Sequence, residues 1–102
     1  MIPIQKVKDI VVKYELLEKE LSTGTIDPKS YANKSKEYAN LGSIIEVARE
    51  YINFNKDKKD LEQILLDKNN DSEMIEMAKK DLTDMETKKD KHESRLKIFL
   101  LP

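Results

Sequence analysis

The sequence contains no cysteine, only two glycines and a single histidine. Without cysteine the chain can form no disulfide framework and offers no thiolate for catalysis, which is compatible with a reducing cytoplasm. Gly24 and Gly42 are too few to build a glycine-rich phosphate-binding loop. No apolar run approaches the roughly 20 residues that span a membrane, and the N-terminus lacks the apolar core of a signal peptide. We therefore expect a cytoplasmic protein that makes no membrane contact.

The sequence also lacks an excess of charge of either sign. It has 19 Lys and Arg residues against 20 Asp and Glu residues, for a formal net charge of -1. Nucleic-acid binding needs a surplus of positive charge, and Arg49 and Arg95 are the only arginines. We interpret the lysine clusters as solvated helix faces, with a weak RNA contact as the alternative. These clusters are Lys56, Lys58 and Lys59, and Lys88, Lys89 and Lys91.

Hydrophobic and charged residues each make up 38% of the 102 residues. Ordinary globular domains are only about a quarter charged, so the chain is either disordered or an elongated helical body with a narrow apolar stripe. Disorder usually comes with high net charge and few large aliphatic residues. Here the charges cancel and Ile and Leu are plentiful, which favours the helical body.

Apolar residues recur at spacings of three and four along most of the chain, which predicts α-helices. Gly24 is a natural left-handed residue at the end of the first helix, and Asp27 followed by Pro28 is a typical helix start. Ser43 and Glu46 predict a capping box at the start of the third helix. The expected helices cover approximately residues 3–21, 27–42, 43–68 and 72–99.

One apolar stripe along each helix supplies the expected core. The tyrosines should pack with their hydroxyl groups at the rim, and the methionines should fill the core. The charged residues lie off the stripes and often pair one helical turn apart. The stripes comprise Ile4, Val7, Val11, Tyr14, Leu17 and Leu21; Tyr31, Ser35, Tyr38 and Leu41; Ile45, Ala48, Ile52, Leu61 and Leu65; and Ile75, Ala78, Leu82, Met85, His92, Leu96 and Phe99. The methionines are Met74, Met77 and Met85, and the expected pairs are Glu15–Lys19, Lys56–Asp60, Glu76–Lys80 and Asp84–Lys88.

The third and fourth helices should each exceed 25 residues and therefore reach about 40 Å. The polar segment NNDSE between them predicts a short turn, with Asn69 or Asn70 closing one helix and Asn70 or Asp71 capping the next. Two long helices joined by a short turn form an antiparallel hairpin. The predicted fold is all-α: one domain with a long antiparallel helical hairpin and two shorter N-terminal helices packed on it.

The sequence offers no catalytic constellation. His92 lies on the fourth stripe between Met85 and Leu96, so we interpret it as a packed or boundary residue. A single histidine flanked by Lys91 and Glu93 does not provide the several ligands that a metal site needs. We therefore predict no catalytic residue, no cofactor-binding residue, no metal ligand and no cofactor.

Four stretches form a recognisable series: KYELLEKELS at residues 13–22, SKEYANLGSIIEVAREY at 35–51, EMAKKDL at 76–82 and LKIFLLP at 96–102. Together they resemble the N-terminal domain of bacterial class-I peptide chain release factors over nearly the whole chain. The closing LLP is typical of the branch that reads UAA and UAG. The break at Gly42 and Ser43 departs from the more acidic or proline-containing break of that family.

The resemblance implies that residues 1–102 are an N-terminal helical domain of a translation termination factor. In the family, the stop-codon-reading tripeptide and the Gly-Gly-Gln loop for peptidyl-tRNA hydrolysis lie in later domains, and this sequence contains neither. The resemblance therefore implies a non-catalytic docking module. Its implied partners are the stalk base of the large ribosomal subunit, both protein and RNA, and the remaining domains of a full-length release factor.

The last six residues, KIFLLP at 97–102, form the densest apolar run of the sequence. Chain termini are usually frayed and polar, so we expect this segment to lead into further chain. The apolar stripes alone are equally consistent with a stand-alone helical-hairpin scaffold or coiled-coil oligomer without a ribosomal role. That alternative stays open at the level of the sequence.

Overall fold

The computed structural model describes residues 2–102, and these residues form four α-helices and no strand. The all-α prediction is therefore confirmed. The helices are α1 (Ile4–Thr23), α2 (Pro28–Gly42), α3 (Ile45–Leu66) and α4 (Ser72–Phe99).

The predicted signals between α1 and α2 are confirmed. Gly24 follows α1 in the left-handed region with φ 67°, where a side chain would add strain. Asp27 is the N-cap of α2, and its Oδ1 accepts a hydrogen bond from the backbone N–H of Lys29 at 3.1 Å. Pro28 occupies the first helical position, where its missing N–H is not needed.

The predicted capping box at Ser43 and Glu46 is wrong. The Ser43 hydroxyl donates to the backbone carbonyl of Asn40 at 2.6 Å, so this side chain ends α2 instead of starting α3. Ile44 precedes α3 without any side-chain cap and is buried. Because no polar side chain caps α3, we infer that burial of Ile44 and Ile45 determines where the helix begins. With 22 residues, α3 is also shorter than the predicted length of more than 25.

The turn of the hairpin uses side chains that the sequence had indicated. The Asn70 side-chain amide donates to the carbonyl of Ile64 at 2.9 Å and so closes the end of α3. Asp71 is the N-cap of α4, because its Oδ1 accepts from the backbone N–H of Met74 at 2.8 Å. The two bonds satisfy backbone groups that each helix end would otherwise leave unpaired.

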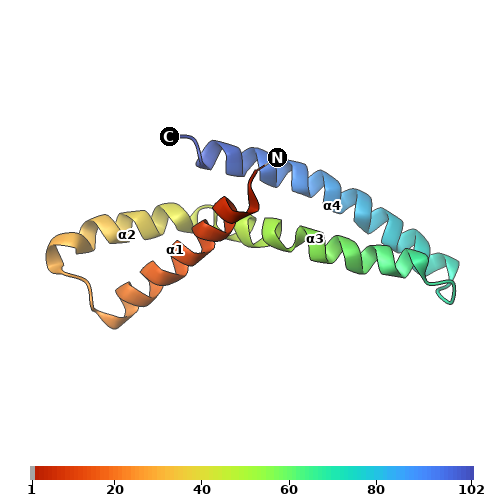
Figure 1. The fold of residues 1–102 in the computed structure, drawn as a ribbon, viewed down its shortest axis with the longest axis horizontal. Helices are drawn as coiled ribbons and strands as arrows, with labels where there is room; N and C mark the ends of the chain where they lie inside the picture. The colour runs from red at the N-terminus through yellow and green to blue at the C-terminus, as the bar shows by residue number, and fades with distance from the viewer. Residues whose placement is uncertain (1) are drawn as a thin grey trace.

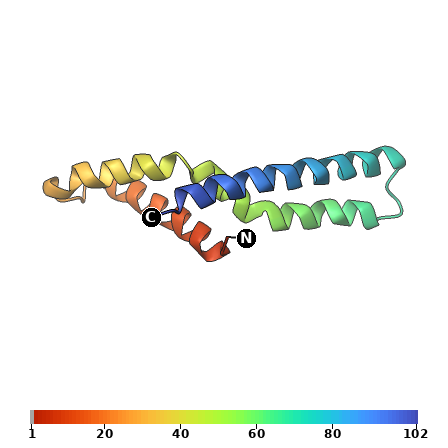
Figure 2. The same cartoon turned by 90° about the horizontal axis from the view of Figure 1, so that it is seen from above.

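The four helices make an elongated body with extents of 61 × 29 × 19 Å. Figures 1 and 2 show α3 and α4 side by side as an antiparallel hairpin, with α1 and α2 diverging at the other end. α1 packs on both α2 and α3, whereas α2 barely reaches α3. The predicted hairpin with two shorter helices packed on one end is confirmed.

The core lies where α1, α3 and α4 meet, and not evenly along the hairpin. Val7 and Leu96 are fully buried there, and Phe99 packs half-buried against the same cluster. The buried members are Ile2, Val7, Ile10, Leu17, Leu41, Ile44, Val47, Ala48, Tyr51, Phe54 and Leu96.

Several predicted core positions are wrong. Ile4 and Tyr31 are 41% and 53% exposed, and Met74 and Met77, which were expected to fill the core, are 46% and 63% exposed. The sequence also missed the buried residues Ile10, Val47, Tyr51 and Phe54. A single stripe per helix cannot describe α3, because α3 buries one face against α1 and another against α4. Near the turn only two helices are present, and two packed helices leave much of each apolar stripe open to solvent.

Candidate functional site

A polar cluster joins the two arms of the hairpin close to the core. His92 on α4 is 8% exposed, and its Nε2 lies 2.5 Å from Oε2 of Glu50 on α3, to which it donates its N–H. Nζ of Lys88, one turn earlier on α4, lies 3.2 Å from the same oxygen. The prediction that His92 is a packed residue is confirmed, and the Phe54 ring lies 5.5 Å from its ring.

The contacts in and around this cluster shift the pKa values of two side chains, Glu50 and Tyr51. Hydrogen bonds from His92 first and from Lys88 second hold the pKa of Glu50 below its ordinary value of 4.5. Next to it, Tyr51 donates its hydroxyl to Oε1 of Glu93 at 3.1 Å. Burial, followed by that hydrogen bond, raises the pKa of Tyr51 above 10.0. Both contacts tie α3 to α4 and favour one register between them.

A second polar cluster holds α1 against α2. Tyr14 and Tyr38 stack with ring centroids 4.7 Å apart, and their hydroxyl oxygens are 3.0 Å apart. Tyr38 donates to Oε2 of Glu18 at 3.0 Å, and the hydrogen bonds with Tyr14 and Glu18 raise its pKa. The guanidinium of Arg49 lies 5.6 Å from the Tyr14 ring centroid, within cation–π range. The predicted packing of Tyr14 and Tyr38 with their hydroxyls at the rim is confirmed.

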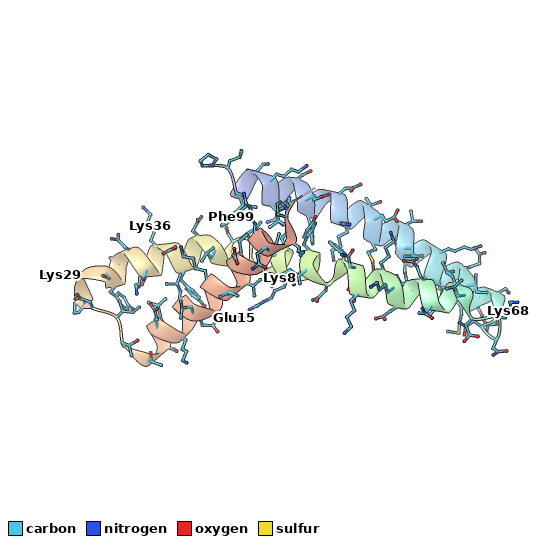
Figure 3. The ribbon with its side chains drawn as sticks, viewed as in Figure 1. Lys8, Glu15, Lys29, Lys36, Lys68 and Phe99 are labelled. Carbon is cyan, nitrogen blue, oxygen red and sulfur yellow. The ribbon has the colours of Figure 1, made fainter. Side chains whose placement is uncertain are left out.

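The predicted ion pairs one turn apart are wrong in the part of the chain that the structure describes. Glu15 pairs with Arg49 across helices at 3.5 Å, and Glu76 pairs with Lys79 at 3.8 Å instead of with Lys80. Interhelical partners lie within reach because the helices pack closely, and a pattern of spacings along one helix cannot show them. Side chains along the outer faces extend into solvent, including the labelled Lys29 and Lys36 on α2 and Lys68 near the turn (Figure 3).

The two arms enclose a long hollow on one side, which we call the hairpin groove. Its wider part, about 500 Å³, has Phe54, Leu61 and Met85 among its lining residues. The remaining residues around this part are Glu50, Asn53, Asp57, Asp81, Asp84 and Lys88. A further part of about 230 Å³ near the turn is lined by Leu61, Ile64, Met74, Met77, Ala78 and Asp81. The groove thus combines an apolar lining with charged residues at its edges.

The clusters offer little that could perform a reaction. His92 has Glu50 as its hydrogen-bonding partner, and among residues 2–102 no serine or threonine hydroxyl is bonded to it as a nucleophile would be. Within residues 2–102, no group of three or more His, Cys, Asp or Glu side chains could hold a metal ion. Over the same residues no helix is long and apolar enough to cross a bilayer. The prediction of no catalytic, cofactor or metal residue stays a prediction.

Sequence reasoning did not find Glu50, Tyr51 or the hairpin groove. Glu50 and His92 are 42 residues apart, and Glu50 does not depart from the surrounding charged pattern, although His92 lies on the predicted apolar stripe. A helical-wheel comparison of the two arms, once their antiparallel register was known, would have placed both residues on facing surfaces. That register depends on the length of the turn, and α3 ends at Leu66, two residues before its predicted end.

The fold and the binding-type surface define a class of protein: a small all-α module built on an antiparallel hairpin, with a packed junction at one end. The chain belongs to the PCRF domain family, because the family model matches residues 10–102.

The relatives point in the same direction. Peptide chain release factor 1 of Pelagibacter ubique is 47% identical over 102 residues, which is all of this chain and 29% of that protein. Peptide chain release factor 1 of Enterococcus faecalis is 40% identical over 101 residues, covering 97% of this chain and 27% of that protein. Peptide chain release factor 1 of Orientia tsutsugamushi is 39% identical over 93 residues, covering 91% of this chain and 26% of that protein. The chain therefore spans less than a third of the length of these relatives, and no solved structure matches it.

Proposed function

We propose that this chain acts in translation termination as the N-terminal docking module of a release factor, over residues 1–102. The single observation that supports this most strongly is the 47% identity to a peptide chain release factor 1 over the complete chain. The PCRF match over residues 10–102 adds to it. In this proposal the module works in the cytoplasm, joined to the remaining domains of a full-length release factor.

The module itself performs no chemistry in this proposal. The family carries its Gly-Gly-Gln loop and its codon-reading tripeptide in later domains, and the present sequence contains neither signature. The one histidine is packed between Glu50 and Phe54, which suits a structural role. Peptide release would then depend on domains outside these residues.

The proposed partner is the ribosome, at the stalk base of its large subunit, with contacts to protein and ribosomal RNA. In a body 61 Å long, the hairpin extends beyond the junction where α1, α3 and α4 pack, so it can project from the rest of a factor, as a docking arm requires. The near-neutral charge favours a surface that binds protein along with RNA over one that binds RNA alone.

A chimera tests this proposal. The chain replaces the matching N-terminal segment of the Pelagibacter ubique release factor 1, and peptide release is measured on ribosomes programmed with a UAA or UAG codon. We expect the chimera to release peptide with kcat/KM within about tenfold of the parent factor, a difference of roughly 1.4 kcal/mol or less. The isolated chain should release none.

Two results would overturn the proposal. Release by the isolated chain would place the chemistry within these residues, and an inactive chimera with intact helical content would remove the assignment to termination. A chimera with Leu96→Asp provides the control, because a charge at this fully buried position should unfold the module and lower release.

A stand-alone scaffold is the second candidate, and the exposed apolar residues favour it. Leu66, Met74 and Met77 are 73%, 46% and 63% exposed near the turn, where a second copy could cover them. Light scattering separates the two functions, because a scaffold of this kind should form stable dimers at micromolar concentration.

A further inference from the structure

The hairpin groove is continuous along one side of α3 and α4. Its wide and narrow parts share Leu61 and Asp81, so that one lining passes from Glu50 to the residues beside the turn. From Glu50 to Ile64 the α3 side rises about 20 Å, or about four helical turns. The groove is therefore long enough to hold about four turns of a single bound helix.

The floor of the groove is apolar and adaptable. Phe54 and Ala78 are buried, Leu61 and Met85 are half-buried, and Met77 is 63% exposed at the open end. Methionine side chains adjust easily to different apolar partners. The floor therefore suits the apolar face of an amphipathic helix.

The walls of the groove are acidic. Four carboxylates line the wide part against one ammonium group, that of Lys88. Glu50 is the member that pairs with Lys88 and His92. In the described part of the chain, Asp57, Asp81 and Asp84 have no ion-pair partner and no side-chain hydrogen bond. Three such carboxylates around an apolar groove repel phosphate groups and attract cations.

The other side of the hairpin is different. A smaller hollow of about 210 Å³ lies there. Phe54 and Met85 line both this hollow and the hairpin groove. Its charges are more balanced, with Lys58 and Lys89 among three carboxylates, and Lys58 pairs with Glu86 at 3.8 Å. The lining of this hollow therefore carries less net negative charge than the lining of the hairpin groove.

We propose that the hairpin groove binds a basic amphipathic helix of a partner protein. The apolar face of that helix packs on Phe54, Leu61 and Met77, while its Lys or Arg side chains pair with Asp57, Asp81 and Asp84. Helix-in-groove recognition of this kind uses apolar anchors spaced by three, four and seven residues. The inference goes beyond the proposed function, since it rests on this chain's own groove and holds with or without ribosome docking.

The probe is a synthetic amidated peptide of about 18 residues, long enough to be helical when bound. It contains Leu and Ala at helical spacing with Lys along both flanks. Binding to the 102-residue chain is measured by titration calorimetry at low salt, and the bound site is mapped by NMR amide shifts. We expect the shifts to concentrate on residues of the groove, and binding to weaken as salt screens the charges.

Two sets of variants distinguish the effect of the groove carboxylates on binding from the effect of the net charge. The triple variant Asp57→Asn, Asp81→Asn, Asp84→Asn should bind the peptide about tenfold more weakly, since it removes three ion pairs to the bound helix. The matched control is Glu46→Gln, Asp60→Asn, Glu62→Gln, which removes the same charge from exposed positions of α3 that line neither hollow and should weaken binding less than about threefold. Met77→Gln, at an exposed position, tests the floor and should also weaken binding.

Some results would overturn the proposal. It fails if the two triple variants weaken binding equally, if the peptide with Glu in place of Lys binds as well, or if the shifts fall outside the groove. Tight binding of a uridine oligonucleotide to the groove would show a nucleic-acid site instead, and self-association through Met77 would show a dimer interface. Helical circular dichroism of each variant excludes unfolding as the cause.

Discussion

Fully buried residues at the junction of the helices contribute more to the stability of this chain than exposed apolar residues near the turn. Leu96 is fully buried, whereas Leu66, also an apolar residue of the hairpin, is 73% exposed. The contribution of a leucine therefore depends on its position along the hairpin, since burial and not residue type supplies the free energy.

We predict that Leu96→Ala lowers the free energy of unfolding by about 2–5 kcal/mol, because it removes buried methyl groups and leaves a cavity. The exposed control Leu66→Ala should change it by less than about 0.5 kcal/mol. Urea unfolding measures both values, and equal effects would contradict the burial that the structure gives to Leu96.

Glu50 gives the stability a pH dependence. Its pKa is lowered in the folded chain, so it contributes stability that is present above its ordinary value of 4.5 and is lost as pH falls through the lowered value. We predict that Glu50→Gln reduces the loss of stability between neutral pH and the acid range. The carboxylate is 46% exposed, so the effect should be modest.

The measurement for Glu50 is urea unfolding at a series of pH values. Glu62→Gln, an exposed residue of the same helix, is the control and should leave the pH slope as in the parent chain. An unchanged slope in the Glu50 variant would mean that the bonds from His92 and Lys88 do not persist in solution.

At the scale of the elements, the helices differ in what stabilises their first turns. α2 and α4 begin with aspartate caps, Asp27 and Asp71, whereas α3 begins at a buried aliphatic pair without a cap. A capped start depends on local sequence, and an uncapped start depends on the neighbouring helices. The start of α3 therefore relies more on tertiary packing than the starts of α2 and α4 do.

We predict that Asp71→Ala lowers the free energy of unfolding by about 1 kcal/mol, because the N–H of Met74 loses its acceptor. Ser43→Ala should have a smaller effect, since the Ser43 hydroxyl binds the end of α2 and does not cap α3. Thermal unfolding of both variants measures the difference. A larger effect at Ser43 would restore the capping box that the sequence suggested.

The whole molecule is long for its size. Its Cα radius of gyration is 18.3 Å, whereas a compact globule of about 100 residues has roughly 13 Å. The hairpin arms beyond the core have only each other to pack on, and this geometry keeps much apolar surface near the turn exposed.

We predict that small-angle scattering gives a radius of gyration well above that of a compact globule, and that light scattering gives a mass near 11.9 kDa. A mass near twice that value would support the scaffold function and argue against the docking module. Measurement over a range of concentrations distinguishes a stable dimer from weak pairing through Leu66, Met74 and Met77.

The sequence alone determined the elements. Helical periodicity, the glycine after α1 and the aspartate caps are local signals, because each acts within a few residues of its own position. They predicted four helices, the hairpin, and the packed state of His92. The family could also be recognised from the order of short motifs, which requires no knowledge of contacts.

Only the tertiary structure decided which residues are buried and which charges meet. α3 packs against two helices on different faces, so Tyr51 and Phe54 became core although they lie off the predicted stripe. Glu50 meets His92 over 42 residues because the turn sets the register of the two arms. The acidic groove arises in the same way, since Asp57 and Asp81 share one surface only after the hairpin has closed. Contacts across helices depend on register and crossing geometry, which no spacing along one helix contains.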